Sequence, residues 1–293
     1  MNTAYINLRL VIGLLITLCS TNTIADSPVW KVTKDDHHIY LGGTIHVLSK
    51  KDYPLPPAFE IAYKDSVELF FETDINAISS PESQALMQKV LISKDGTTIR
   101  NTISTETYQT LIEYLEPRQI PVEALNLLTP AGLSLTLMGI ELQRLGLMLD
   151  GGVDHHFNSR SSSDGKQIGI LETIEEQVSF INSLNDIDAN LLISSTLQDL
   201  NNLSNEWPDL IAAWRSGDLV KLEEIGVKPM RDLAPSVYEV FLVNRNNKWM
   251  DDIETMFADK DIEFVLVGAL HMAGEHGLIK QLKAANYEIV QLD

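Results

Sequence analysis

The sequence has a single cysteine, few basic residues and no apolar run long enough to cross a membrane. One cysteine, Cys19, cannot form a disulfide within the chain. The 22 basic residues stand against 41 acidic ones, and the resulting net charge of −19 repels nucleic acid and anionic lipid. The sequence also lacks a His-Glu-x-x-His motif, a Gly-x-Ser-x-Gly motif and a phosphate-binding loop. These absences give no support to a zincin, a serine hydrolase or a nucleotide enzyme.

Residues 1–25 have the features of a secretory signal peptide. Arg9 is their only charge, residues 10–18 form an apolar run, and residues 23–25 (TIA) supply a cleavage site. The run is shorter than the roughly 20 residues of a membrane helix, although an uncleaved anchor is the alternative. The bulky Leu18 argues against lipidation of Cys19. Cleavage leaves 21 basic and 41 acidic residues and no thiol. We therefore expect an exported chain, periplasmic or secreted, with no membrane span.

The remaining residues, 26–293, have the pattern of one α/β domain. Strand patterns occur at residues 29–33, 38–41, 67–74, 167–171, 263–267 and 287–292. Helical spacing fills residues 81–148 and 174–260, and we expect helix boundaries at Asn205, Gly217 and Pro229. The apolar strand at 167–171 is expected to be buried. The sequence thus predicts a mixed β-sheet with flanking helices and a large helical insertion in the middle of the chain.

Two segments repeat one pattern, an apolar strand followed by Gly-x-x-His. They are residues 41–46 (LGGTIH) and 266–271 (LVGALH). A glycine lets the backbone turn as the strand leaves the sheet, and the histidine three residues later stands above the strand end. If the two strands are neighbours, His46 and His271 converge on one cleft. Each motif alone is also compatible with a histidine that only hydrogen-bonds in the core.

Carboxylates follow other strands in the same way. Glu72 comes directly after an apolar strand, where its charge is costly unless it is paired or binds a metal. It is therefore a ligand, a base, an N-cap or a salt-bridge partner. Glu172 ends another strand, and Asp154, with His155 beside it, is either a ligand or a helix cap. Imidazoles and carboxylates without thiolate suit a divalent ion, with manganese, cobalt and zinc all admitted.

The order of these motifs resembles the TraB/PrgY/GumN family, in its bacterial GumN-like branch. The blocks that carry the resemblance are residues 41–47, 53–57, 71–74, 152–157, 171–177, 244–250 and 267–277. They span almost all of the mature chain. The family is similar to the Tiki proteins, metal-dependent proteases that use two Gly-x-x-His motifs and a glutamate.

The resemblance implies roles for particular residues. His46, His271 and Glu72 become metal ligands, and Glu72 is also a catalytic candidate. Arg245, next to Asn244 in an Asn-Arg-Asn block, becomes a catalytic residue that contacts an oxyanion or a carboxylate, unless it forms only a structural salt bridge. Leu270 departs from the family pattern, which often has glycine there, and we expect its side chain to narrow the cleft.

Two functions remain open from the sequence. The first is an exported metal-dependent hydrolase, peptidase-like, that acts on a peptide or a small carbonyl compound. The second is a protein that sequesters a peptide or small ligand without turning it over, and its ligand atoms would be hydrogen-bonded to one another. A structural accessory of the envelope is a third reading. The sequence indicates no particular oligomeric state.

Overall fold

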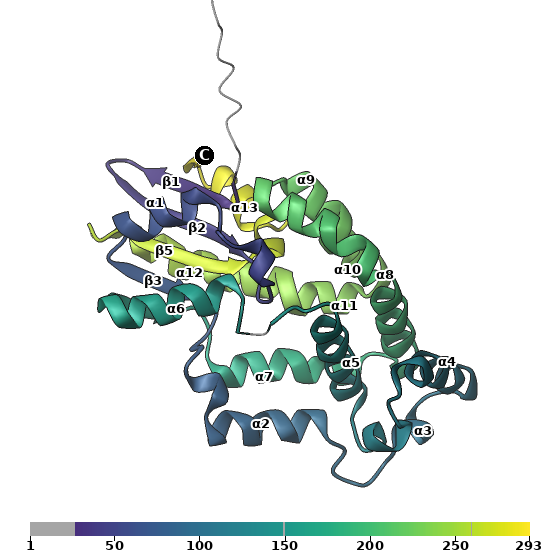
Figure 1. Ribbon diagram of the computed structural model, residues 1–293. Helices are drawn as coiled ribbons and strands as arrows, with labels where there is room; N and C mark the ends of the chain where they lie inside the picture. The colour runs from purple at the N-terminus through teal and green to yellow at the C-terminus, as the bar shows by residue number, and fades with distance from the viewer. Residues whose placement is uncertain (1–26, 149, 259) are drawn as a thin grey trace, which may run out of the picture.

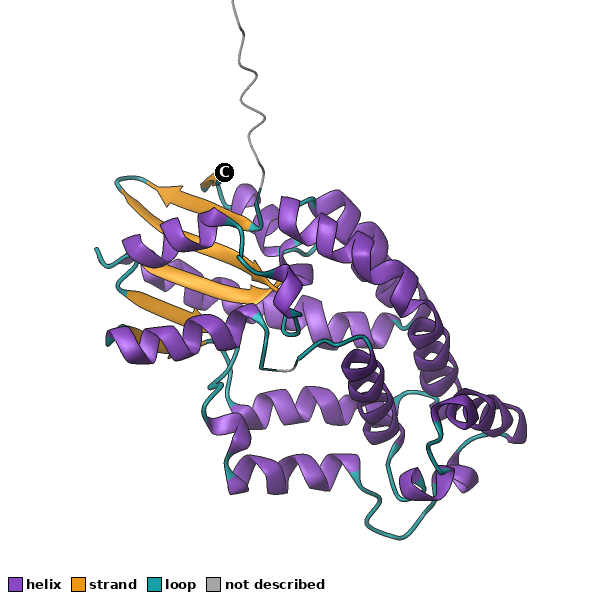
Figure 2. Ribbon diagram, in the orientation of Figure 1, coloured by secondary structure: helices purple, strands orange, loops and turns teal. Residues whose placement is uncertain are grey.

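The computed structural model describes residues 27–148, 150–258 and 260–293, so the expected signal peptide and Cys19 lie outside the described residues. A β-sheet with helices on both faces forms one part of the molecule, and a layer of helices extends from it (Figures 1 and 2). The C-terminus lies beside the sheet. The predicted fold class, α/β with a mixed sheet and flanking helices, is confirmed.

The sheet has six strands in the order β4-β3-β5-β2-β1-β6. Their bounds are β1 Val29–Lys34, β2 His37–Thr44, β3 Glu68–Phe71, β4 Gln167–Ile170, β5 Glu263–Gly268 and β6 Glu288–Gln291. β4, β3, β5 and β2 are mutually parallel, whereas β1 is antiparallel to both of its neighbours. The carboxyl ends of the four parallel strands therefore lie along one edge of the sheet, where open α/β sheets bind their ligands.

Helices cover both faces of the sheet because successive strand residues point to opposite sides. One face packs against α1 (Pro57–Asp65) and α6 (Val153–Asp164), and the other against α12 (Asn244–Thr255) and α13 (Leu278–Ala284). In β5, Phe264 belongs to the first core. Its neighbour Val265 belongs to the second. Both strand faces are thus buried, which fixes the register of β5 and the position of its carboxyl end.

The middle of the chain forms the helical layer. Its helices are α2 Pro81–Leu91, α3 Ile99–Thr102, α4 Thr105–Leu115, α5 Pro130–Arg144, α7 Ile174–Ser183 and α8 Ala189–Ser216. A separate core that includes Leu111, Leu133 and Leu197 holds α4, α5 and α8 together. Short helices then lead back to the sheet: α9 Leu219–Leu222, α10 Lys228–Leu233 and α11 Pro235–Tyr238. Figure 1 shows α8 running from the other helices of this layer toward the sheet.

Two local predictions are wrong. The helix α8 continues through Asn205 and ends only at Gly217, whose φ of 61° is the left-handed conformation that glycine adopts readily. Asparagine lowers helix propensity only mildly, so packing against the core of the helical layer overrides it. The strand β4 is exposed rather than buried, with Ile168 and Ile170 at 37% and 43%. It lies at the sheet edge, where one side has no neighbouring strand.

Candidate functional site

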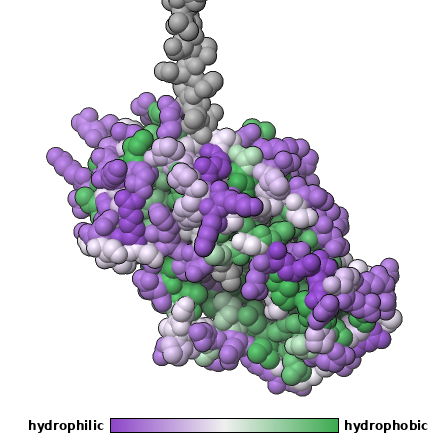
Figure 3. All heavy atoms as spheres, viewed as in Figure 1, coloured by the Kyte–Doolittle hydropathy of each residue, from purple (hydrophilic) through white to green (hydrophobic). Residues whose placement is uncertain are grey.

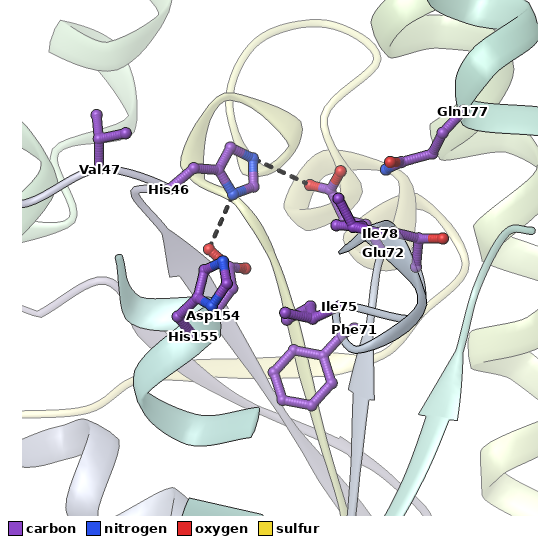
Figure 4. Close-up of a pocket in the computed structure, with 10 residues that line it drawn as sticks. His46, Val47, Phe71, Glu72, Ile75, Ile78, Asp154, His155 and Gln177 are labelled. Carbon is purple, nitrogen blue, oxygen red and sulfur yellow. Dashed lines mark hydrogen bonds and ion pairs between the residues drawn. The ribbon is translucent and has the colours of Figure 1, made fainter. Parts of the chain in front are cut away.

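Four side chains from separate strand ends meet at the carboxyl edge of the sheet. His46 follows β2, Glu72 follows β3 and Glu172 follows β4. His271 lies in a short 3-10 helix, Ala269–Met272, that directly follows β5. The Nε2 atoms of His46 and His271 lie 3.9 and 4.0 Å from the same carboxylate oxygen, Oε1 of Glu72. Figure 4 shows His46 between Glu72 and Asp154 at the rim of a pocket.

Two glycines make this convergence possible. A Cβ on Gly152 would lie 2.2 Å from the carbonyl oxygen of His46, so only glycine lets the start of α6 pack this closely on the His46 backbone. A Cβ on Gly268 would lie 3.3 Å from Glu72 Oε1 and 3.5 Å from His46 Nε2. The bare Cα of Gly268 thus leaves open the space that these two side chains surround.

Asp154 orients His46. One carboxylate oxygen accepts from Thr44 Oγ1 at 2.9 Å, and the other lies 2.8 Å from His46 Nδ1. Because Asp154 is buried and His46 is 62% exposed, the carboxylate anchors an imidazole that reaches outward. Attraction to Asp154, with a further contribution from Glu72, raises the pKa of His46 to about 9. The remaining ring nitrogen, Nε2, faces Glu72.

Asn246 orients His271. Its Nδ2 donates to the carbonyl oxygens of His271 and His276 at 3.1 and 2.7 Å, so its Oδ1 must accept from His271 Nδ1 at 2.6 Å. The ring proton therefore sits on Nδ1 and the lone pair on Nε2. Burial and the Arg245 guanidinium outweigh the opposing effect of Glu72 and lower the pKa of His271 to about 3. His271 is neutral at neutral pH.

Arg245 joins the two glutamates. Its Nε and Nη2 donate to Glu172 at 3.0 and 2.5 Å, and Nη2 also donates to Glu72 Oε2 at 2.5 Å. Burial raises the pKa of Glu172, and Arg245 opposes that rise. For Glu72 the effect of burial is outweighed: Arg245, the histidines and the Gly268 N–H hold the pKa of that carboxyl well below its usual range. Glu72 is thus a firmly ionised carboxylate with little tendency to take up a proton.

These donors match a divalent ion in kind. Their two Nε2-to-Oε1 distances lie just below about 4.2 Å, the largest separation of two atoms that share one ion at about 2.1 Å, so the side chains would have to move closer together to hold one. Second partners on Nδ1, here Asp154 and Asn246, are typical of metal-binding histidines. Arg245 Nη1, however, donates to His271 Nε2 at 3.2 Å. This contact occupies the lone pair that His271 would offer to an ion.

As it stands, the site is closed by this guanidinium. Among residues 27–148, 150–258 and 260–293, no group of three or more histidine, cysteine, aspartate or glutamate side chains is arranged to hold a metal ion. The arrangement therefore combines ligand-type atoms with an internal cation that occupies part of their coordination.

The other candidate residues lie at different distances from this cluster. Asp154 contacts the cluster through His46, and Glu172, itself a member, is joined to it by Arg245. His155 lines the adjoining pocket. Asn244 is exposed at the start of α12. The asparagine of that block that contacts the cluster is Asn246, which is fully buried, and the sequence did not indicate it because the pattern does not show which residues of the helix face inward.

Leu270 does not narrow the pocket, contrary to expectation. A Cβ on Gly226 would lie only 2.5 Å from Leu270 Cδ2, so the leucine packs against that glycine. It is absent from the described residues that line the pocket beside His46. The side chain points elsewhere because the 3-10 turn after β5 directs His271, one residue later, into the site.

A model of the TraB/PrgY/gumN family matches residues 28–291. The chain belongs to this family. The protein designated uncharacterized protein YbaP of Escherichia coli (strain K12) is 23% identical over 248 residues, which cover 85% of this chain and 89% of that protein. The protein of the same designation from Shigella flexneri shows the same identity and coverage. No solved structure matches. The predicted membership of the TraB/PrgY/gumN family is thus confirmed. In this chain the two Gly-x-x-His motifs end neighbouring parallel strands, β2 and β5.

Proposed function

We propose that the chain is an exported, metal-dependent hydrolase that acts on a peptide or another carbonyl compound. The observation that carries this proposal is the convergence of His46 Nε2 and His271 Nε2 on one oxygen of Glu72. Membership of the TraB/PrgY/gumN family is consistent with it. A divalent ion such as manganese, cobalt or zinc, held by these three residues, would polarise a carbonyl and lower the pKa of a bound water to about 7.

Glu72 serves as a ligand or as the base in this proposal. Its Oε1 is the atom on which both Nε2 atoms converge, and despite its burial Arg245 and the Gly268 N–H hold the pKa of this carboxyl below its usual range, which favours the role of ligand. Asp154 and Asn246 fix the two imidazoles so that each presents Nε2. In the hydrolysis, the oxygen of water bonds to the carbonyl carbon, the bond to the leaving group breaks, and a proton from water passes to that group.

Arg245 supplies a fixed positive charge beside the reacting centre. Its guanidinium is held on the far side by two hydrogen bonds to Glu172, and it lies over the rings of Trp249 and Phe180. Its Nη1, which now donates to Phe241 O and His271 Nε2, would have to give up one of these partners to donate to an oxygen that gains negative charge during carbonyl addition. We assign Glu172 as the residue that positions Arg245.

A second function, sequestration of a ligand without turnover, is favoured by one observation. Arg245 donates both to Glu72 and to His271 Nε2, so the ligand-type atoms are already hydrogen-bonded to a side chain of the protein. A site closed in this way resembles a binding site more than an open catalytic metal site, which keeps a position for water.

Export is part of the proposal and rests on residues 1–25. None of the helices within the described ranges is long and apolar enough to cross a membrane. We expect the mature chain to begin at Asp26 and to occur in the periplasm or the medium. Fractionation followed by mass measurement of the intact chain checks this, and a full-length chain retained in the cell would contradict it.

The hydrolase proposal is tested with the mature chain, stripped of metal by a chelator and reloaded separately with manganese, cobalt or zinc. Cleavage of a complex peptide mixture is followed by mass spectrometry. We expect cleavage only after reloading, and none in the variants His46→Ala, His271→Ala and Glu72→Gln. His38→Ala is the matched control, because His38 lies at the opposite end of β2 and contacts Asp65.

Two outcomes would count against hydrolysis. Cleavage that persists in all three site variants would place the activity elsewhere or in a contaminant. A folded wild-type chain that binds peptides but never cleaves them, with every metal tested, would leave the sequestering function in its place.

A further inference from the structure

A pocket of about 230 Å³ opens directly beside His46 and Glu72. The polar side chains of the site line one side, and Phe71, Ile75 and Ile78 supply apolar lining on the side of Glu72, while Val47 lines the pocket beyond His46. Figure 4 shows Ile75 and Phe71 below the gap between His46 and Glu72. Sites for whole drug-sized ligands usually enclose roughly 300–1,000 Å³, so this pocket suits a group the size of one side chain.

Two of the apolar lining residues, Ile75 and Ile78, lie in the loop that follows β3, and hydrogen bonds hold this loop in place. Asp74 Oδ1 accepts from the backbone N–H groups of Asn76 and Ala77 at 3.0 and 3.1 Å. Asn158, on α6, donates from Nδ2 to Asn76 Oδ1 at 2.9 Å. The loop after β3 is therefore tied both to itself and to the helix that carries Asp154. It holds Ile78 at 45% exposure, a position that costs hydrophobic stabilisation unless a ligand covers it.

The charges around the pocket select against a charged group. No lysine or arginine is among its described lining residues. Its carboxylates, Glu72 and Asp154, are already bonded to Arg245, His46 and Thr44. A basic side chain would find no free acid there, and an acidic one would have to compete with Asp154 and Glu72 for the His46 imidazole. An uncharged apolar group is the one that the lining favours.

Two polar groups stand beside the apolar lining. Thr73 also lines the pocket, is only 4% exposed, and its hydroxyl has no hydrogen-bond partner among the described residues. The hydroxyl is buried, so a ligand would bond it only after the Thr73 side chain turns toward the pocket, and that bond would satisfy a group that is unpaired in the free chain. Gln177, on α7, donates from Nε2 to Glu172 Oε1 at 3.0 Å and points toward Glu72 in Figure 4. A hydroxyl and an amide beside apolar side chains are the kinds of group that hydrogen-bond a peptide group.

The surroundings extend the same character. Figure 3 shows apolar side chains gathered over the helical layer and around the hollow between that layer and the sheet. Large apolar residues exposed in the helical layer include Ile92, Leu127, Leu135 and Leu191, and none of them is among the described residues that line the pocket.

We propose that this pocket is the subsite for one uncharged, apolar side chain of a peptide, with Thr73 bonding the adjoining peptide group. The inference rests on the proposed function, because it places that residue next to the carbonyl that His46 and Glu72 face. It assigns Ile75 and Ile78 as residues that determine specificity and Thr73 as a binding residue.

The test compares three short synthetic peptides, capped at both ends and identical except for a central leucine, aspartate or lysine. Their affinities for the mature chain are measured by calorimetry and their cleavage by mass spectrometry. We expect the leucine peptide to bind about tenfold or more tightly than the other two, and Ile78→Asp to abolish that preference. Ile61→Asp is the matched control, since Ile61 is 51% exposed on α1 and lies outside the pocket.

Thr73→Val supplies an independent readout. It keeps the shape but removes the unpaired hydroxyl, so we expect a higher melting temperature together with weaker binding of the leucine peptide. A leucine preference without cleavage would support the subsite and count against the hydrolase. Cleavage without any preference would do the reverse. Equal affinity of all three peptides, no binding at all, or the same loss in Ile61→Asp would overturn the subsite.

Discussion

The carboxyl edge of the sheet and the helical layer each bury an arginine against a glutamate. At the sheet edge, Arg245 faces two carboxylates, Glu72 and Glu172. In the helical layer the ratio is reversed, because one carboxylate, Glu141, accepts from Arg118 at 3.0 Å and lies 3.5 Å from Arg144. The first cluster therefore has an excess of acid and the second an excess of base.

The two clusters also differ in what completes them. Glu141 accepts a third hydrogen bond from the Tyr114 hydroxyl at 2.9 Å, and Arg118 stacks over the Tyr114 ring. At the sheet edge, the atoms beside the glutamate are two imidazole nitrogens, and a pocket adjoins them. A buried ion pair alone thus says little about function. A surplus of carboxylate, oriented imidazoles and an adjoining pocket together distinguish a site from a structural pair.

The largest expected effect breaks the charge balance of the sheet edge. Arg245→Met leaves Glu72 and Glu172 buried without their cation, and we expect the free energy of unfolding at pH 7 to fall by about 3–5 kcal/mol. Denaturant titration measures the loss. Adding Glu172→Gln should recover part of it, because one buried charge is removed.

The effect of manganese on the Arg245→Met variant is a second measurement of the same charge balance. An ion can replace the guanidinium between the carboxylates, so manganese should raise the melting temperature of Arg245→Met more than that of the wild type. A loss of stability below about 1 kcal/mol, or no added stabilisation by manganese, would contradict the view that Arg245 offsets two buried acids.

A smaller effect is expected where a carboxylate only orients a ligand. Asp154→Asn keeps the side-chain shape but weakens the hold on His46 Nδ1, so we expect affinity for manganese or zinc to fall about 10- to 100-fold. Calorimetry on the folded variant measures it. Asp164→Asn, at the other end of α6, is the control, since Asp164 accepts from the Tyr63 hydroxyl at 2.6 Å. Equal losses in both variants would mean that the helix, rather than the contact with His46, is responsible.

The smallest effect belongs to the helical layer. Arg118 and the Tyr114 hydroxyl outweigh the effect of burial and lower the pKa of Glu141 in the folded protein. Its stabilisation is therefore fully present above the unfolded value of about 4.3 and is lost as pH falls through the lower folded pKa. We expect Glu141→Gln to cost about 1–2 kcal/mol at pH 7, and less as the pH falls below the unfolded pKa, with metal affinity unchanged. A cost that does not depend on pH would contradict an ionised Glu141.

The sequence predicted part of the cluster at the carboxyl edge of the sheet. The two Gly-x-x-His motifs and the glutamate after an apolar strand can be recognised from neighbouring residues alone. These local patterns predict that polar side chains lie at strand ends. The sheet then brings them together, because β3, β5 and β2 are parallel neighbours. The pairing of Arg245 with Glu172 was not predictable, since it joins residues 73 positions apart through the packing of α12 on the sheet.

Other features depend on details that patterns do not carry. Choosing Asn246 over Asn244 requires knowing which side of α12 faces the core, and Thr73 emerges only as a hydroxyl that packing leaves without a partner. The apolar run of β4 suggested a buried strand, but its place at the sheet edge is set by the order of all six strands. The sequence thus indicated which residues carry reactive groups, but not which way the side chains of α12 face or that β4 lies at the sheet edge.

We propose that His46, His271 and Glu72 act together on one divalent ion. Calorimetric titration of the metal-free mature chain with manganese and with zinc, beside His46→Ala and His271→Ala, decides whether they do. We expect binding of about one ion per chain in the wild type and loss of that binding in both variants, which remain folded by circular dichroism. Undiminished binding in either variant, or no binding of either ion to the folded wild type, would contradict it.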